Sequence, residues 1–86
     1  MVSAEETSNN TTRLKQAFVN ALNIETTQVT DALTYNEIAE WDSTAHMILI
    51  AELEDEFDVM LDTDDIIDMS SFAQAKHILS KYDVAF

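Results

Sequence analysis

The amino-acid sequence predicts an all-α fold, a small antiparallel bundle of three main helices and one short helix with a long first loop. Its 86 residues suffice for one small domain. It contains neither glycine nor proline, so turns depend on Asn, Asp, Ser and Thr, and tight β-hairpins are disfavoured. Apolar residues recur at helical spacing in three separate segments, which indicates three amphipathic helices that bury one face each.

The first helix is expected to follow a flexible polar tail formed by residues 1–10. In the segment TTRLKQAFVNALNI, apolar residues recur at positions i, i+3, i+4, i+7 and i+8, which places them on one face. Thr11 or Thr12 can cap the start of this helix, and Asn23 can take the left-handed conformation that ends many helices. The predicted core face consists of Leu14, Ala17, Phe18, Ala21 and Leu22.

Residues 24–42 are expected to form a long connection, because their apolar residues follow no sustained period. A loop of this length needs anchoring to the core, and a short helical turn can form around residues 35–39. Trp41, the only tryptophan, is expected to cover one end of the core. The anchoring side chains are Ile24, Val29, Leu33, Tyr35, Ile38 and Trp41.

The second helix is expected from just after Ser43 to about Phe57, with Asp58 as the left-handed residue past its end. It has two apolar stripes, of which one belongs to the core. The other stripe has acidic neighbours, which predicts either a docking surface or packing beneath the long first loop. The core stripe contains His46, Leu49, Ile50, Leu53 and Phe57, the second stripe contains Met47, Ile48 and Ala51, and its acidic neighbours are Glu52, Glu54 and Asp55.

Two further helices are predicted near the C-terminus. Residues 64–69, DDIIDM, can form one or two helical turns. The last helix can begin with Ser70 or Ser71 as its N-cap and has Lys81 in its last turn. Its core face is expected to consist of Phe72, Ala75, Ile78, Leu79 and Tyr82.

The net charge of −13 disfavours nucleic acid as a partner, because phosphates would be repelled. Most of the 17 acidic residues lie between Glu37 and Asp68, a range without lysine or arginine. Such a surface attracts partners with basic surfaces, although the acids can also be a merely solvated face.

Several other functional classes are also disfavoured. Without cysteine there is no disulfide, thiolate nucleophile or cysteine zinc site, and His46 and His77 are too far apart for a zinc motif. An EF-hand that began at Asp62 would need Gly and Glu where Ile67 and Ala73 stand. No apolar run approaches the ~18 residues that span a bilayer, and the N-terminus lacks the pattern of a signal peptide. We therefore expect a cytoplasmic monomer that does not insert into membranes.

Ser43, in the stretch EWDSTAHM, lies where the second helix begins. Its hydroxyl can cap the helix, or it can carry a phosphate ester that the positive end of the helix dipole would stabilise. Physical arguments alone leave both roles open. Hydrolysis is disfavoured, because His46 lies only three residues later on the same helix and no GxSxG turn is present.

The segment WDSTAHMILIAELEDEF resembles the cofactor attachment site of acyl carrier proteins and peptidyl carrier proteins. In this family Asp-Ser-Leu begins the second helix, and an acidic stretch that ends in Phe follows. Here Asp42, Ser43 and Thr44 stand at those positions, and ELEDEF follows at the family's spacing. The segment DTDDIIDMSSFAQAKHIL is similar to the family's acidic loop, short helix and closing helix. The resemblance covers about residues 12–82, implies an acyl-carrier-like fold for residues 11–86, and is closest to stand-alone carriers of specialised pathways.

The resemblance implies that a phosphopantetheinyl transferase moves 4′-phosphopantetheine from coenzyme A to the Ser43 oxygen. The thiol of this arm would carry an acyl or aminoacyl group as a thioester between enzymes of fatty-acid, polyketide or related specialised biosynthesis. The carrier itself would catalyse nothing, and the absence of cysteine fits a sulfur supplied by the cofactor. Asp42 would orient the transferase, its metal or the arm, unless it only caps the loop.

Enzymes that load or accept the acyl group are expected to dock on the second helix through basic or apolar surfaces. Thr44 replaces the family's usual leucine, Trp41 precedes Asp42 where glycine is usual, and Ile48 replaces an acid found in housekeeping carriers. These departures imply partners other than the standard fatty-acid enzymes. The predicted docking residues are Thr44, Met47, Ile48, Ala51, Glu52 and Asp55.

Two alternatives remain open at this stage. His46 can approach the phosphodiester on Ser43, or it can be a packed residue with satisfied hydrogen bonds. The chain can also be an acidic helical interaction adaptor without a cofactor, for which Ser43 would be dispensable. The identity of the cargo is not encoded in any motif of the sequence.

Overall fold

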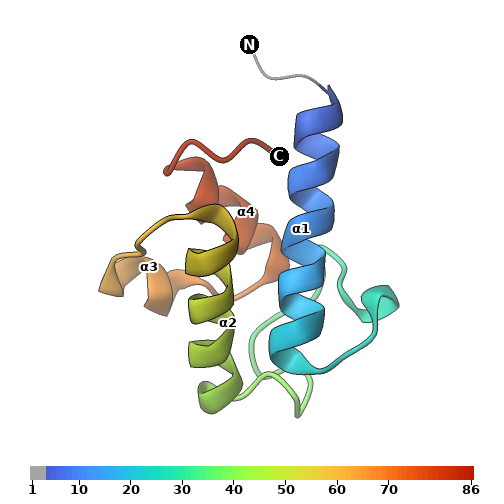
Figure 1. Ribbon diagram of the computed structural model, residues 1–86. Coiled ribbons are helices and arrows are strands. Elements are labelled where there is room, and N and C mark those ends of the chain that lie inside the picture. Colours follow the sequence, from blue (N-terminus) through green and yellow to red (C-terminus); the bar gives the residue numbers. More distant parts are fainter. Residues whose placement is uncertain (1–3) are drawn as a thin grey trace.

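The computed structural model describes residues 4–86, and this range contains four α-helices, one short 3₁₀ helix and no strand (Figure 1). Helices α1 and α2 run antiparallel, and α3 lies beside α2 on the side away from α1. The predicted all-α bundle, with one short helix and a long first loop, is confirmed. The elements are α1 Ala4–Leu22, η1 Thr26–Gln28, α2 Ser43–Phe57, α3 Thr63–Asp68 and α4 Phe72–Ser80.

Helix α1 begins earlier than the sequence predicted. Residues 4–10 are helical, so the prediction of a loose tail is wrong for them, and the first three residues lie outside the described part of the chain. Within this stretch the side chain of Asn10 is buried, and its amide donates a hydrogen bond to the carbonyl of Ala85 (3.0 Å). Thr11 and Thr12 do not cap the helix. Their hydroxyls donate to carbonyls four residues earlier, at 3.0 and 3.1 Å.

The core is built around three aromatic rings. Phe18 of α1 contacts Trp41 and Phe72 edge to face, with ring centroids 5.3 and 5.1 Å apart. Trp41 is fully buried at the entrance to α2, as predicted for the residue that covers the end of the core. The predicted core faces are buried at Leu14, Ala17, Phe18, Ala21 and Leu22 of α1, Leu49, Ile50 and Leu53 of α2, and Phe72, Ala75, Ile78 and Leu79 of α4.

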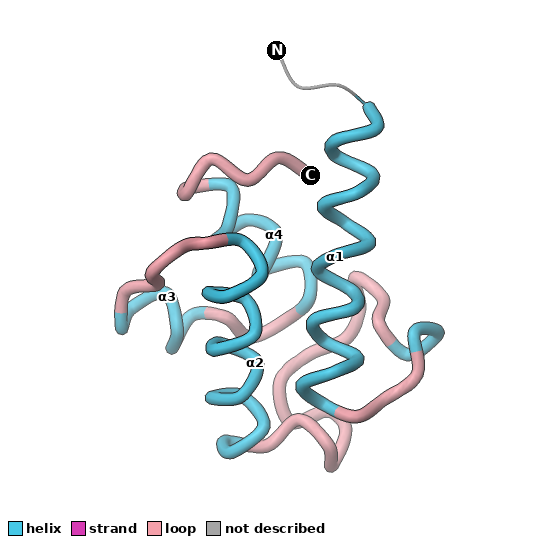
Figure 2. Tube along the Cα trace, in the orientation of Figure 1, coloured by secondary structure: helices cyan, strands magenta, loops and turns pink. Residues whose placement is uncertain are grey.

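The connection between α1 and α2 is long and mostly irregular (Figure 2). Its anchoring residues are buried except Tyr35, which is exposed, and Ile38, which is half-buried. The suggested helical turn at residues 35–39 does not form. Instead the Tyr35 amide donates to Ser70 (2.7 Å), and the Asn36 amide donates to Trp41 (3.1 Å), so this backbone forms turns that face the core and the start of α4.

The predicted ends of several helices are confirmed. Asn23 and Asp58 adopt left-handed conformations after α1 and α2, with φ of 56° and 53°. Ser71 is the N-cap of α4, and its hydroxyl accepts a hydrogen bond from the Gln74 amide (2.9 Å). Residues without glycine's freedom therefore supply the turns, as the composition required.

Candidate functional site

At the start of α2, one residue caps the helix and the next is the candidate attachment residue. Asp42 is the N-cap: its carboxylate accepts a hydrogen bond from the Ala45 amide, and its carbonyl accepts one from the His46 amide, both at 2.8 Å. Ser43 is therefore the first helical residue, and the possibility that its hydroxyl caps the helix is wrong. The Ser43 side chain is exposed, and its hydroxyl has no hydrogen-bond partner within residues 4–86. The result is a free hydroxyl at the positive end of a 15-residue helix.

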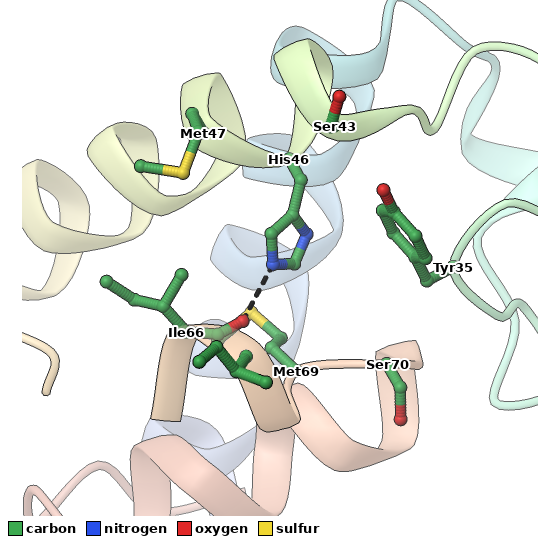
Figure 3. A pocket seen from close by; sticks show the side chains of 8 residues that line it. Tyr35, Ser43, His46, Met47, Ile66, Met69 and Ser70 are labelled. Carbon is green, nitrogen blue, oxygen red and sulfur yellow. Dashed lines mark hydrogen bonds between the residues drawn. The ribbon is translucent and has the colours of Figure 1, made fainter. Parts of the chain in front are cut away.

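Ser43 lies at the edge of a pocket of ≈ 380 Å³ between α2, α3 and the loop at Tyr35 (Figure 3). Ser43 and Met47 come from α2, whereas Ile66, Met69 and their neighbours form the opposite side. The walls are mostly apolar, and a few polar side chains are interspersed, an arrangement typical of small-molecule sites. The apolar lining consists of Met47, Ile66, Ile67 and Met69, and the polar lining of Tyr35, Ser43, His46 and Ser70.

His46 is a packed residue that connects α2 to α3. The indole N–H of Trp41 donates to His46 Nδ1 (3.0 Å), and His46 Nε2 lies 2.8 Å from the Ile66 carbonyl oxygen. Because Nδ1 accepts, Nε2 carries the proton and donates it to that carbonyl. The two rings are also stacked, with centroids 6.0 Å apart. Both ring nitrogens are engaged, so the packing alternative for His46 is confirmed and neither nitrogen is free for a group on Ser43.

A second set of polar contacts joins α3 to the segment that follows α4. The carboxylate of Asp65 is only 5% exposed and accepts hydrogen bonds from the Lys81 ammonium and the Tyr82 hydroxyl. The Lys81 hydrogen bond, and then the Tyr82 hydrogen bond, lower the pKa of Asp65. The bond to Asp65 in turn raises the pKa of Lys81 and of Tyr82. Helix α3, one wall of the pocket, is thus fixed both to α2 and to the end of α4.

Sequence analysis missed this cluster and the pocket. Asp65 is one of four acids in the stretch DTDDIID, and nothing in their spacing distinguishes the buried one from the exposed ones. The contacts of Asp65 with Lys81 and Tyr82 span 16 and 17 residues, so no local periodicity encodes them. Tyr35 was expected only to anchor the loop.

The predicted docking residues form an exposed face of α2. Met47 is 57% exposed and Ile48 is 48% exposed, so the alternative that they pack beneath the first loop is wrong. Ile67 of α3, which is 72% exposed, lines the same pocket as Met47 and continues the apolar surface. Thr44, Ala51 and Asp55 are also exposed, and Glu52 is half-buried.

Most of the acids beside this face form no ion pair within residues 4–86. Lys76 forms an ion pair with Asp31 (2.7 Å), and Lys81 with Asp65, both away from the exposed face of α2. Arg13 lies near the end of α2, where its guanidinium is 3.6 Å from a Glu56 oxygen and packs over the Phe57 ring. Along α2 the described basic residues therefore meet the acids only at the C-terminal end.

No protein-family model matches the chain, and no curated protein sequence matches it. Among residues 4–86, no helix combines the length and apolar character needed to cross a bilayer. Within the same range, no three His, Asp or Glu side chains converge on a point where they could hold a metal ion. The function proposed below therefore rests on the site and on the resemblance of residues 41–57.

Proposed function

We propose that the chain is a stand-alone acyl carrier protein that bears a 4′-phosphopantetheine arm on Ser43. The observation that carries the proposal is the exposed Ser43 hydroxyl at the first position of α2, in a segment that resembles a carrier attachment site. Within the described residues 4–86 this hydroxyl has no hydrogen-bond partner. The arm supplies the thiol that holds an acyl or aminoacyl group as a thioester. The protein presents this group to partner enzymes and catalyses no reaction itself.

The residues around Ser43 fit a phosphodiester at this position. The first amides of a helix have no intrahelical partner, and they favour negative charge together with the helix dipole. Asp42 uses its carboxylate to satisfy the Ala45 amide, which starts the helix at Ser43 and leaves the serine oxygen exposed. The exposure also gives a transferase access to the oxygen that must attack the phosphate of coenzyme A.

The exposed face of α2 suits the partners of such a carrier. Met47, Ile48 and Ala51 offer an apolar centre, and Glu52 and Asp55 offer negative charge beside it. A partner surface with an apolar centre and basic groups around it would complement this face. The phosphopantetheinyl transferase and the enzymes that load and accept the acyl group are the proposed partners.

The second candidate is an acidic helical adaptor that binds partners through the same face without a cofactor. The exposed apolar residues of α2 and the net charge of −13 favour it as much as they favour a carrier. An adaptor without a cofactor does not require the Ser43 hydroxyl beside the apolar pocket. Ser43 therefore separates the two candidates.

The test is the intact mass of the protein after incubation with coenzyme A and a broad-specificity phosphopantetheinyl transferase. We expect a gain of one phosphopantetheine in the wild type and none in Ser43→Ala. Ser70→Ala is the matched control, because Ser70 is exposed and lines the same pocket, and it should load like the wild type. If several transferases fail to load the wild type, or if Ser43→Ala loads normally, the carrier proposal is wrong and the adaptor is favoured.

A further inference from the structure

The ring of Tyr35 is packed against its neighbours, whereas its side chain remains exposed. Its amide donates to the Ser70 carbonyl (2.7 Å), and its ring packs edge-on against Trp41 and His46, with centroids 5.9 and 5.3 Å apart. Its side chain is nevertheless exposed, and its hydroxyl has no hydrogen-bond partner among the described residues. A phenylalanine would make the same ring contacts. The packing of the loop therefore gives no role to the oxygen.

This hydroxyl lies in the pocket that begins at Ser43. Tyr35 and Ser43 line the same cavity, and Figure 3 shows the tyrosine oxygen directed toward the end of α2 from which Ser43 projects. Met47 and Ile67 supply apolar walls farther along. The pocket thus combines a free donor near the attachment oxygen with an apolar surface beyond it.

The inner end of the pocket is closed. His46 lines it with both ring nitrogens already bonded, and the fully buried Trp41 stacks behind His46. Phe18, which is fully buried, packs edge to face against Trp41 in the adjacent core. A group attached to Ser43 can therefore lie along the α2–α3 surface, but it meets packed rings in the direction of the bundle interior.

We infer that this pocket holds the pantetheine portion of the arm and that the Tyr35 hydroxyl is its hydrogen-bonding contact. The inference rests on the proposed function of Ser43. Pantetheine is amphipathic, since a branched dimethyl carbon stands next to a hydroxyl and two amides. The Tyr35 O–H donates to an oxygen of the arm, while the dimethyl carbon packs against Met47 and Ile67. Tyr35 thereby orders the proximal arm on the α2–α3 surface.

The test uses NMR of the full chain loaded with coenzyme A that carries ¹³C in the dimethyl group. Loading releases adenosine 3′,5′-bisphosphate, so the matched reference is free 4′-phosphopantetheine with the same label. In the wild type we expect the methyl resonances to shift from their positions in this reference and to show cross-peaks to the Tyr35 ring and the Met47 methyl. In Tyr35→Phe, which keeps the ring, most of that shift should be lost. Ser70→Ala is the matched control, because it removes another hydroxyl from the lining of the pocket, one that Figure 3 shows directed away from Ser43. It should retain the full shift.

The outcomes separate this inference from the function on which it rests. Methyl resonances identical to those of free 4′-phosphopantetheine, on a protein whose mass shows loading, overturn the inference and leave the carrier function intact. A full shift in Tyr35→Phe shows that the hydroxyl makes no contact and also overturns it. Absence of any loading on Ser43 overturns both proposals together.

Discussion

Asp42 and Ser43 are neighbours in sequence but have opposite environments. The Asp42 carboxylate is engaged by the Ala45 amide at 2.8 Å, whereas the Ser43 hydroxyl is exposed and unpartnered in the described structure. Serine is itself a good N-cap, and its oxygen would be occupied if the helix began one residue later. Placing the cap on Asp42 keeps the serine oxygen available for modification.

The cap can be tested by its contribution to stability. Asp42→Ala should lower the free energy of unfolding by about 1 kcal/mol, because the Ala45 amide loses its partner. Asp42→Asn keeps an oxygen acceptor and should lose much less, and Ser43→Ala should change stability by less than about 0.5 kcal/mol. Urea denaturation followed by the fluorescence of the buried Trp41 measures all three. An alanine variant at position 42 as stable as the wild type would contradict the capping role.

The sequence singled out Ser43 and Asp42 as candidate site residues, because their types and spacing in EWDSTAHM carry the resemblance. It could not predict the role of Tyr35. Within the chain Tyr35 is one loop residue among several, and its amide bonds beside the pocket to Ser70, 35 residues later. Likewise, His46 had two open roles until its bonds to Trp41 and Ile66 were seen.

At the scale of the elements, α3 depends on its neighbours. A helix of 6 residues is too short to be stable alone, so side-chain contacts must hold it in place. His46 holds the Ile66 carbonyl from α2, and Lys81 and Tyr82 hold Asp65 from the end of α4. Because Ile66 and Ile67 line the pocket, these contacts also set the position of its wall.

The Asp65 cluster predicts a specific dependence of stability on pH. The hydrogen bonds from Lys81 and Tyr82 lower the pKa of Asp65 in the folded protein below its ordinary value of 3.8. A lowered folded-state pKa contributes stability that is present above pH 3.8 and is lost as the pH falls through the folded-state value. The advantage of the wild type over Asp65→Asn should therefore be steady near neutral pH and shrink below about pH 3.8.

Urea denaturation at a series of pH values measures this difference. Asp64→Asn is the control, because it removes one acid from α3 at an exposed position and reports the general effect of the charge. A difference between wild type and Asp65→Asn that does not change from neutral to acidic pH would contradict the assignment of this ion pair.

Most element boundaries could be predicted from periodicity and capping. The features that could not be predicted involve contacts between residues distant in sequence. The apolar faces of α1, α2 and α4 are buried as their spacing predicted. In the early part of α1, Asn10 bonds to Ala85, 75 residues away. The turns at residues 35–39 depend on bonds to Trp41 and Ser70. Contacts of this kind have no local signature.

At the scale of the whole molecule, a closely packed aromatic core is surrounded by excess negative charge. Phe18, Trp41 and Phe72 meet at the centre, and the net charge is −13. Repulsion among the acids destabilises the compact state, although the same field favours solubility and would attract the basic partners proposed above. Fold stability and partner attraction therefore respond in opposite directions to salt.

We expect the midpoint of thermal unfolding to rise as NaCl increases from ~0.01 M to ~1 M, because the screening length falls from ~30 Å to ~3 Å. The exposed pair Lys76–Asp31 opposes this trend, since salt weakens it, but such pairs contribute little. Circular dichroism melts at several salt concentrations measure the sign of the effect. A midpoint that falls with salt would show that ion pairs outweigh the repulsion, contrary to this account.

Peptide mapping can locate the arm on the chain. After loading with coenzyme A, a protease that cleaves after glutamate releases residues 41–52, WDSTAHMILIAE, whose only hydroxyl side chains are Ser43 and Thr44. Fragmentation of this peptide in the mass spectrometer should place one phosphopantetheine on Ser43. Phosphopantetheine on Thr44 or on another peptide, or a peptide 41–52 that stays unmodified, would contradict the claim that the Ser43 oxygen is the point of attachment.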